Sequence, residues 1–95
     1  MNIEQIKLKN GTALALKFEM CSAPLLVIKA EKGFAMCGYL DIGTANKLND
    51  TAVKVIDVKD FEEMLNARVK EVSEKAKEIG ITLEMTVRDA LERMF

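Results

Sequence analysis

Histidine and tryptophan are absent from this chain of 95 residues, which has one proline and only two cysteines, Cys21 and Cys37. Without histidine, the chain lacks the commonest general base and the commonest neutral metal ligand. Two cysteines are too few for a disulfide framework and, with no histidine beside them, too few for a zinc site. We therefore expect no metal site and no cofactor, and a catalytic Cys–His pair within one chain is excluded.

Long apolar runs are missing as well. The longest mostly apolar stretch, Cys21 to Ile28, has eight residues and includes a serine and the proline, whereas a membrane-spanning helix needs about 20. The N-terminus does not resemble a signal peptide, because charged residues interrupt its apolar residues from Glu4 onward. We therefore expect a cytoplasmic protein with reduced thiols and no membrane partner.

The charges nearly cancel: 14 lysines and arginines face 15 aspartates and glutamates, for a net charge of −1. This balance gives no electrostatic reason to expect nucleic acid as a partner. Hydrophobic residues make up 49% of the chain and charged residues 31%, which is the composition of a folded protein. The length fits a single domain, residues 1–95, with a modest core.

The first part of the chain has the period-2 pattern of strands. Asn10-Gly11 can form a tight hairpin turn with positive φ, and beyond it the apolar side chains of residues 14, 16, 18 and 20 share one face. Residues 25–30 and 34–40 follow as a second hairpin, apolar on both faces. The pattern predicts a four-stranded antiparallel meander, with a further strand at 52–58.

Helix signals dominate from residue 59 onward, where apolar residues from Phe61 to Ile79 recur at spacings of three and four. Residues 66–68 are expected to break this run into two helices, Gly80 to end the second and Thr86 to cap a final one. A short helix near 42–48 lies within the mainly β region, 1–58. The fold class expected is therefore α+β, an N-terminal antiparallel β-sheet with C-terminal helices packed on one of its faces.

The predicted helices cover about one face of this sheet, yet its central strands are apolar on both. We expect Leu26, Ile28, Phe34 and Met36 on one face, and five residues on the other: Leu25, Val27, Ala35, Cys37 and Tyr39. An exposed apolar face usually marks an interface. The sequence therefore predicts self-assembly into a homo-oligomer through the N-terminal sheet, unless the short helix and the fifth strand cover the second face.

The central run Gly33 to Asp41, GFAMCGYLD, resembles the YunC-like family, a small bacterial and archaeal domain of unknown function. The C-terminal half continues the resemblance in the family's order at Phe61–Leu65, Val69–Ala76, Ile79–Ile81, Met85 and Asp89–Leu91. The resemblance implies an α+β fold whose N-terminal β region assembles subunits, typically into tetramers, and it implies no activity. The chain departs from the family pattern at Arg68, where proline is expected, and at Glu84 and Thr86, in a loop usually rich in glycine.

Four neighbouring residues are the candidates for chemistry or binding. Cys37 is the candidate nucleophile, although a buried cysteine often serves only to fill a core. Gly38 could admit a ligand or relieve close packing, and Tyr39 could line a pocket or pack in an interface. Asp41 could help to bind a ligand or simply cap the helix after it. The carboxylates at 57, 60, 62 and 63 are expected to form a solvated helix end rather than a cation site.

Nothing in the sequence identifies a substrate. Our first hypothesis is an oligomeric, non-enzymatic module that binds a small ligand or serves as a scaffold. The alternative is an enzyme or redox-responsive protein that uses Cys37 near a subunit interface, where a lysine or aspartate of a neighbour completes the site. Nucleic-acid binding is disfavoured by the charge.

Overall fold

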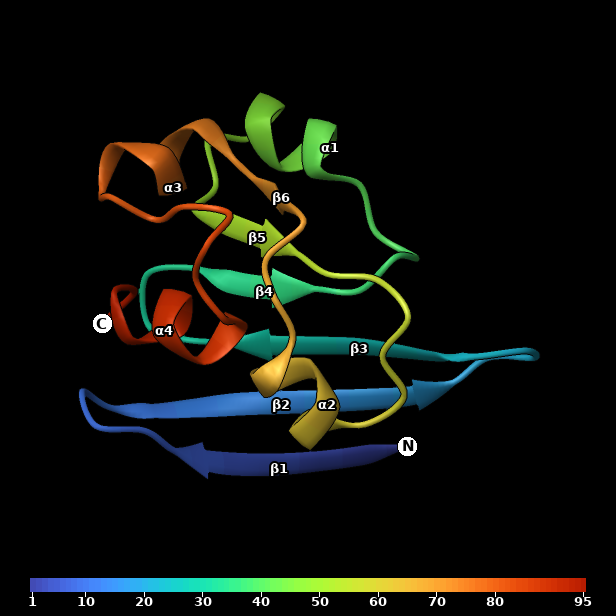
Figure 1. Ribbon diagram of the computed structural model, residues 1–95. Helices are drawn as coiled ribbons and strands as arrows, with labels where there is room; N and C mark the ends of the chain where they lie inside the picture. Colours follow the sequence, from blue (N-terminus) through green and yellow to red (C-terminus); the bar gives the residue numbers. More distant parts are fainter.

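The computed structural model describes residues 1–95 and begins with two antiparallel hairpins (Figure 1). They consist of β1 (Asn2–Lys7), β2 (Thr12–Glu19), β3 (Pro24–Lys29) and β4 (Phe34–Met36). The fourth strand ends earlier than expected, because the chain turns after Met36, where the amide of Leu40 donates to the carbonyl oxygen of Cys37 at 3.2 Å. The predicted meander is confirmed.

Two more strands widen the sheet to six, in the order β1-β2-β3-β4-β5-β6. The fifth, β5 (Ala52–Lys54), is shorter than expected and runs parallel to β4, because α1 (Ile42–Lys47) carries the chain back between them. The sixth, β6 (Glu71–Val72), pairs antiparallel with β5. The sheet is thus mostly, but not wholly, antiparallel.

Three helices follow: α2 (Phe61–Asn66), α3 (Glu74–Glu78) and α4 (Val87–Glu92). In Figure 1, α2 and α4 lie in front of the same face of the sheet, so the predicted α+β class is confirmed. The predicted second helix was wrong in its first half, because residues from 68 to 72 are extended. Arg68 forms an isolated β-bridge with Thr86. Val72 pairs with Val53, although the spacing of Val72 from the preceding apolar residues suits a helix.

Side-chain caps start α1 and α4 as the sequence suggested. Thr86 accepts the amide of Asp89 at 3.2 Å, and Gly80 ends the α3 region with φ of 86°. The first hairpin turn has another basis than expected, since neither Asn10 nor Gly11 has positive φ. A Cβ atom at position 11 would collide with the ring of Phe95, so glycine lets that ring lie against the turn. The tip of this hairpin is held by α4, because the carboxylate of Glu92 accepts the amides of Lys9 and Asn10, each at 2.8 Å.

The main core lies between the sheet and helices α2 to α4 and contains 18 buried residues, among them Leu26, Ile28, Met64 and Leu91. A second, smaller cluster of three buried residues, Met36, Ala45 and Ala52, lies on the other face of the sheet, beneath α1. This helix covers only β4 and β5, because its cluster includes no residue of β1, β2 or β3. The opposite face is therefore covered in part.

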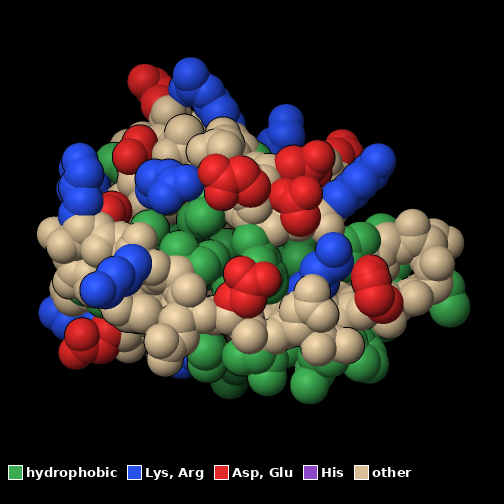
Figure 2. All heavy atoms as spheres, turned by 90° about the horizontal axis from the view of Figure 1, so that it is seen from below, with side chains coloured by type: hydrophobic (Ala, Val, Ile, Leu, Met, Phe, Trp, Pro, Cys, Tyr) green, Lys and Arg blue, Asp and Glu red, His purple; other side chains and the backbone are tan.

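The rest of that face, which we call the open face, is largely apolar and, apart from Leu25, lacks cover within the chain. Its apolar side chains come from β1, β2 and β3: Ile3, Leu14, Leu16, Phe18, Leu25 and Val27, of which Leu25 also packs against the main core. The same register places Gln5, Lys7, Thr12 and Lys29 on this face. Three of the apolar side chains are about half exposed, Ile3 at 60%, Leu14 at 50% and Phe18 at 48%. Figure 2 shows hydrophobic side chains gathered along the lower border of the molecule, on the side away from the helices.

The expected division of residues between the two faces was partly wrong. Because Val27 pairs with Met36 and Ile28 pairs with Ala35, Phe34 and Met36 share a face with Val27 and not with Ile28. Ala35 lies on the helix-covered face instead. The error arose from the pairing register of β3 and β4, which depends on the turn between Ala30 and Gly33.

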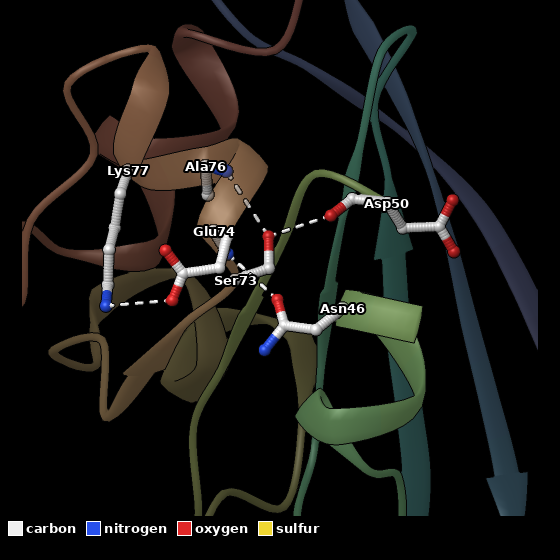
Figure 3. Close-up of polar contacts among 6 residues, drawn as sticks. All are labelled: Asn46, Asp50, Ser73, Glu74, Ala76 and Lys77. Atoms are coloured by element: carbon white, nitrogen blue, oxygen red, sulfur yellow. Dashed lines mark hydrogen bonds and ion pairs between the residues drawn. The ribbon is translucent and has the colours of Figure 1, made fainter. Parts of the chain in front are cut away.

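A buried serine, Ser73, joins the edge of the sheet at β5 and β6 to the helices beside it (Figure 3). The hydroxyl of Ser73, which is fully buried, donates to the carbonyl oxygen of Asp50 at 2.8 Å and accepts the amides of Ala52 and Ala76. Beside it, the side-chain oxygen of Asn46 accepts the amide of Glu74 at 2.8 Å. These bonds join α1, β5 and α3.

No helix of the protein has both the length and the apolar character that crossing a membrane requires.

Candidate functional site

Three of the four candidate residues line one cavity at the end of the sheet where β3 begins and β4 ends. The cavity has a volume of about 210 Å³ and is lined by Ala23, Pro24, Cys37, Gly38, Tyr39, Asp57 and Val58. Its walls come from the β2–β3 turn, the residues after β4, and the segment that leads from β5 to α2. The fold thus joins the predicted run 37–39 to two segments distant in sequence.

Cys37 forms the inner wall of this cavity and is only 4% exposed. Its amide donates to the carbonyl oxygen of Leu26 at 3.2 Å, and the amide of Leu26 donates to its Sγ at 3.3 Å. The cysteine therefore extends the β3–β4 pairing by one residue while its sulfur serves as an acceptor. It belongs to the main core and also lines the cavity.

Gly38 and Tyr39 form the outer wall, and both are exposed. A Cβ atom on Gly38 would come no nearer than 3.6 Å to a neighbour, the Cγ2 of Ile56, which is ordinary contact. The interpretation that glycine relieves close packing here is therefore wrong. Tyr39 is 48% exposed, so its ring is available both to the cavity and to solvent.

Asp57 also lines this cavity, which the sequence pattern does not indicate, because Asp57 lies among the carboxylates that lead into α2. It is one of two residues other than glycine with positive φ, at 60°. Aspartate tolerates this left-handed conformation better than most residues. Its carboxylate is the only charged group that lines the cavity, and it takes part in no side-chain hydrogen bond or ion pair of the protein.

The other carboxylates of that region have structural partners. Asp60 caps α2 by accepting the amide of Glu63 at 2.8 Å, and Glu63 accepts the amide of Lys59 at 2.8 Å. Glu62 lies 3.9 Å from Arg88 of α4. The chain brings together no group of three or more Cys, Asp or Glu side chains that could hold a metal ion. Asp57 stands apart from its neighbours in having no such partner.

Asp41 does not line the cavity. The carboxylate of Asp41 caps α1, since Oδ2 of Asp41 accepts hydrogen bonds from the amide of Thr44 at 3.1 Å and from the hydroxyl of Thr44 at 3.0 Å. The hydroxyl of Thr44 first, and then the amide of Gly43, lower the pKa of Asp41 below its ordinary value. The structure thus gives Asp41 a capping role and separates it from the other three candidates.

A second, larger cavity of about 440 Å³ lies beside β6, between α1 and α3. Its lining residues are Ile42, Lys70, Glu71, Val72, Lys77, Ile81, Thr82 and Leu83. Sequence reasoning gave no sign of it, because its walls depend on the two-residue strand β6. Two lysines and one glutamate line it; Lys77 pairs with Glu74 and Glu71 pairs with Lys54, so Lys70 is the lining charge without an ion pair.

Three comparisons relate the chain to other proteins. A crystal structure of a protein of unknown function from Thermoplasma acidophilum, TA1206, is similar over 99% of this chain and 92% of its own, with a TM-score of 0.94 and 38% identity. The uncharacterized protein YunC of Bacillus subtilis (strain 168) is 24% identical over 98 residues, covering 99% of this chain and 97% of YunC. The family model described as Domain of unknown function (DUF1805) matches residues 36–94, more than half of the chain, so the protein belongs to that family, as its resemblance to the YunC-like proteins predicted.

Proposed function

We propose that the protein is a homo-oligomeric module, without enzymatic activity of its own, whose subunits assemble through the N-terminal sheet. The observation that carries this proposal is the open face, with six apolar side chains on three adjacent strands: Ile3, Leu14, Leu16, Phe18, Leu25 and Val27. Soluble monomers rarely leave such a contiguous apolar surface in water. A second copy of the same face is a matching occupant, because apolar side chains of both would then be buried.

The size of the open face favours more than one contact for each subunit. Strands β1, β2 and β3 have six, eight and six residues, so at about 3.3 Å per residue and a spacing of about 4.8 Å they present roughly 320 Å² in projection. A standard interface buries about 800 Å² on each partner. In projection, the open face alone supplies less than half of that area.

The outer edge of β1 offers the second contact. This strand pairs with β2 alone, so its other edge presents unpaired backbone groups, which is a template for another strand. Antiparallel pairing of β1 with its copy would extend the sheet, and two such extended sheets could pack open face to open face. Together these contacts give a tetramer, which is the assembly we favour.

Light scattering coupled to gel filtration at micromolar concentration tests this proposal. We expect a mass near four times the subunit mass of 10.6 kDa. Leu14→Lys should reduce that mass, because it places a charge in the proposed interface. Leu48→Lys is the matched control: Leu48 is 66% exposed at the end of α1, outside the open face. A monomeric native protein, or equal effects of the two lysines, would refute assembly through this face.

A second candidate function uses Cys37 as a nucleophile or redox-responsive thiol. The observation that favours it is the position of Cys37 in a cavity that also presents Tyr39 and Asp57. The rate of alkylation of Cys37 as a function of pH, with the exposed Cys21 as internal reference, tests this candidate. Fast modification of Cys37 below pH 8 in the folded protein would support it. Modification only after denaturant is added would leave Cys37 as a packing residue.

A further inference from the structure

The cavity beside Cys37 has a distinctive chemical lining. Ala23, Pro24 and Val58 give it apolar walls, Tyr39 gives it an aromatic ring, and Asp57 gives it one negative charge. No lysine or arginine lines it. An anion would therefore meet the Asp57 carboxylate and no compensating cation, whereas a cation would meet an unpaired carboxylate.

The aromatic ring favours the same sign of charge. The face of a tyrosine ring attracts a cation positioned within about 6 Å of its centre, and Tyr39 is half exposed at the cavity wall. Asp57 and Tyr39 come from segments 18 residues apart in the chain and meet only through the fold. Two independent groups that attract cations thus flank one apolar cavity.

The volume restricts the size of the occupant. At about 30 Å³ for each water molecule of the liquid, the 210 Å³ of this cavity equal about seven waters. Pockets for drug-sized ligands begin at about 300 Å³, so the cavity suits a compact ligand better than a whole nucleotide or a large cofactor. A bare metal ion is disfavoured as well, because no second carboxylate joins Asp57 here.

We propose that this cavity binds a small organic cation, an ammonium group attached to a compact apolar body. The ammonium group pairs with the carboxylate of Asp57 and lies against the ring of Tyr39, while the apolar body contacts Pro24 and Val58. The cavity is formed by one chain, so this inference does not depend on the proposed assembly.

Benzylammonium is a suitable probe, with benzyl alcohol and benzoate as neutral and anionic controls of the same size. Each is titrated into ¹⁵N-labelled protein at pH 7, and the amide resonances are followed. We expect saturable shifts centred on Gly38, Tyr39 and Asp57 with benzylammonium, weaker ones with benzyl alcohol and none with benzoate. Raising the salt concentration should weaken the binding of the cation alone.

Substitutions at Asp57 and Tyr39 test whether these two residues bind the cation. Asp57→Asn removes the carboxylate, and the fold is preserved because asparagine also accepts positive φ. The affinity for benzylammonium should fall about fivefold, which is the upper range for an exposed ion pair. Asp60→Asn is the matched control, because Asp60 lies outside the cavity and asparagine also caps helices. Tyr39→Leu should weaken binding about two- to fivefold, and Tyr39→Phe should restore it.

Several results would overturn the proposal. One is benzoate or benzyl alcohol binding as tightly as benzylammonium, and another is shifts confined to a different part of the protein. A third is no saturable shift at tens of millimolar probe. Equal losses in the Asp57 and Asp60 variants would show a general effect of charge rather than a site. The Leu14→Lys variant should bind the probe normally, which separates this test from that of assembly.

Discussion

The two faces of the sheet differ in a way that strand β2 makes plain. Its small residues, Ala13 and Ala15, point into the core and are at most 1% exposed, whereas its large residues, Leu14 and Phe18, point to the open face and are about half exposed. In most half-buried strands the larger apolar side chains are the buried ones. The arrangement in β2 is the reverse.

On the two faces the bulky apolar side chains come from different elements. On the covered face, bulky side chains such as Met64 and Leu91 come from the helices, so alanines on β2 let the two layers approach. On the open face the bulk comes from the sheet itself. The open face presents large apolar side chains, and no other part of the chain packs against most of them. Such a surface suits a second subunit, which is why we assign the open face to assembly.

The largest effect that tests this comparison is expected from Ala15→Leu. Ala15 is fully buried, so the added atoms would force the helix layer away from the sheet, and overpacking of this kind costs about 1–3 kcal/mol in the free energy of unfolding. Urea denaturation measures the loss. Thr12→Leu adds an apolar side chain to the same strand at an exposed position and should change stability by less than about 0.5 kcal/mol. Similar losses in both variants would contradict the asymmetry of the two faces.

Much of this asymmetry follows from local sequence pattern, and the parts that do not are nonlocal. The period-2 run from residue 13 to 20 predicts strand β2 and its two faces, and Asp41 and Thr86 mark two helix starts correctly. The strand β6 could not be predicted, because Val72 also fits a helical spacing and two residues carry too little pattern. Its conformation is set by pairing with Val53.

The candidate site shows the same limit. The run from Cys37 to Tyr39 is continuous in sequence, so its members were bound to lie close together. Asp57 joins them only because the segment after β5 passes the end of β4, where the amide of Val55 donates to the carbonyl oxygen of Met36 at 3.0 Å. A single sequence gives no direct signal of that tertiary contact.

A smaller effect is expected where α1 covers part of the second face. Asn46→Ala removes the acceptor for the amide of Glu74, a bond of 2.8 Å, and should cost about 0.5–1.5 kcal/mol. Loosening α1 should expose Met36 and Ala52 and so enlarge the open face. Hydrogen exchange measures this, with faster exchange expected in α1 and no change in α4. Unchanged exchange in α1 would mean that the apolar cluster alone holds the helix.

The smallest effect concerns the cap of the same helix. Because hydrogen bonds from Thr44 and Gly43 lower the pKa of Asp41 in the folded protein, the ionised carboxylate stabilises α1 above the ordinary value of 3.8. This contribution should be lost as the pH falls from 3.8 through the lower pKa of the folded state. Asp41→Asn keeps a capping side chain that cannot titrate, so the difference in urea midpoint between the native protein and this variant should shrink across that range. A constant difference down to pH 2 would show that the cap does not depend on the charge of Asp41, and α1 would then be held on the sheet by its apolar contacts and by Asn46.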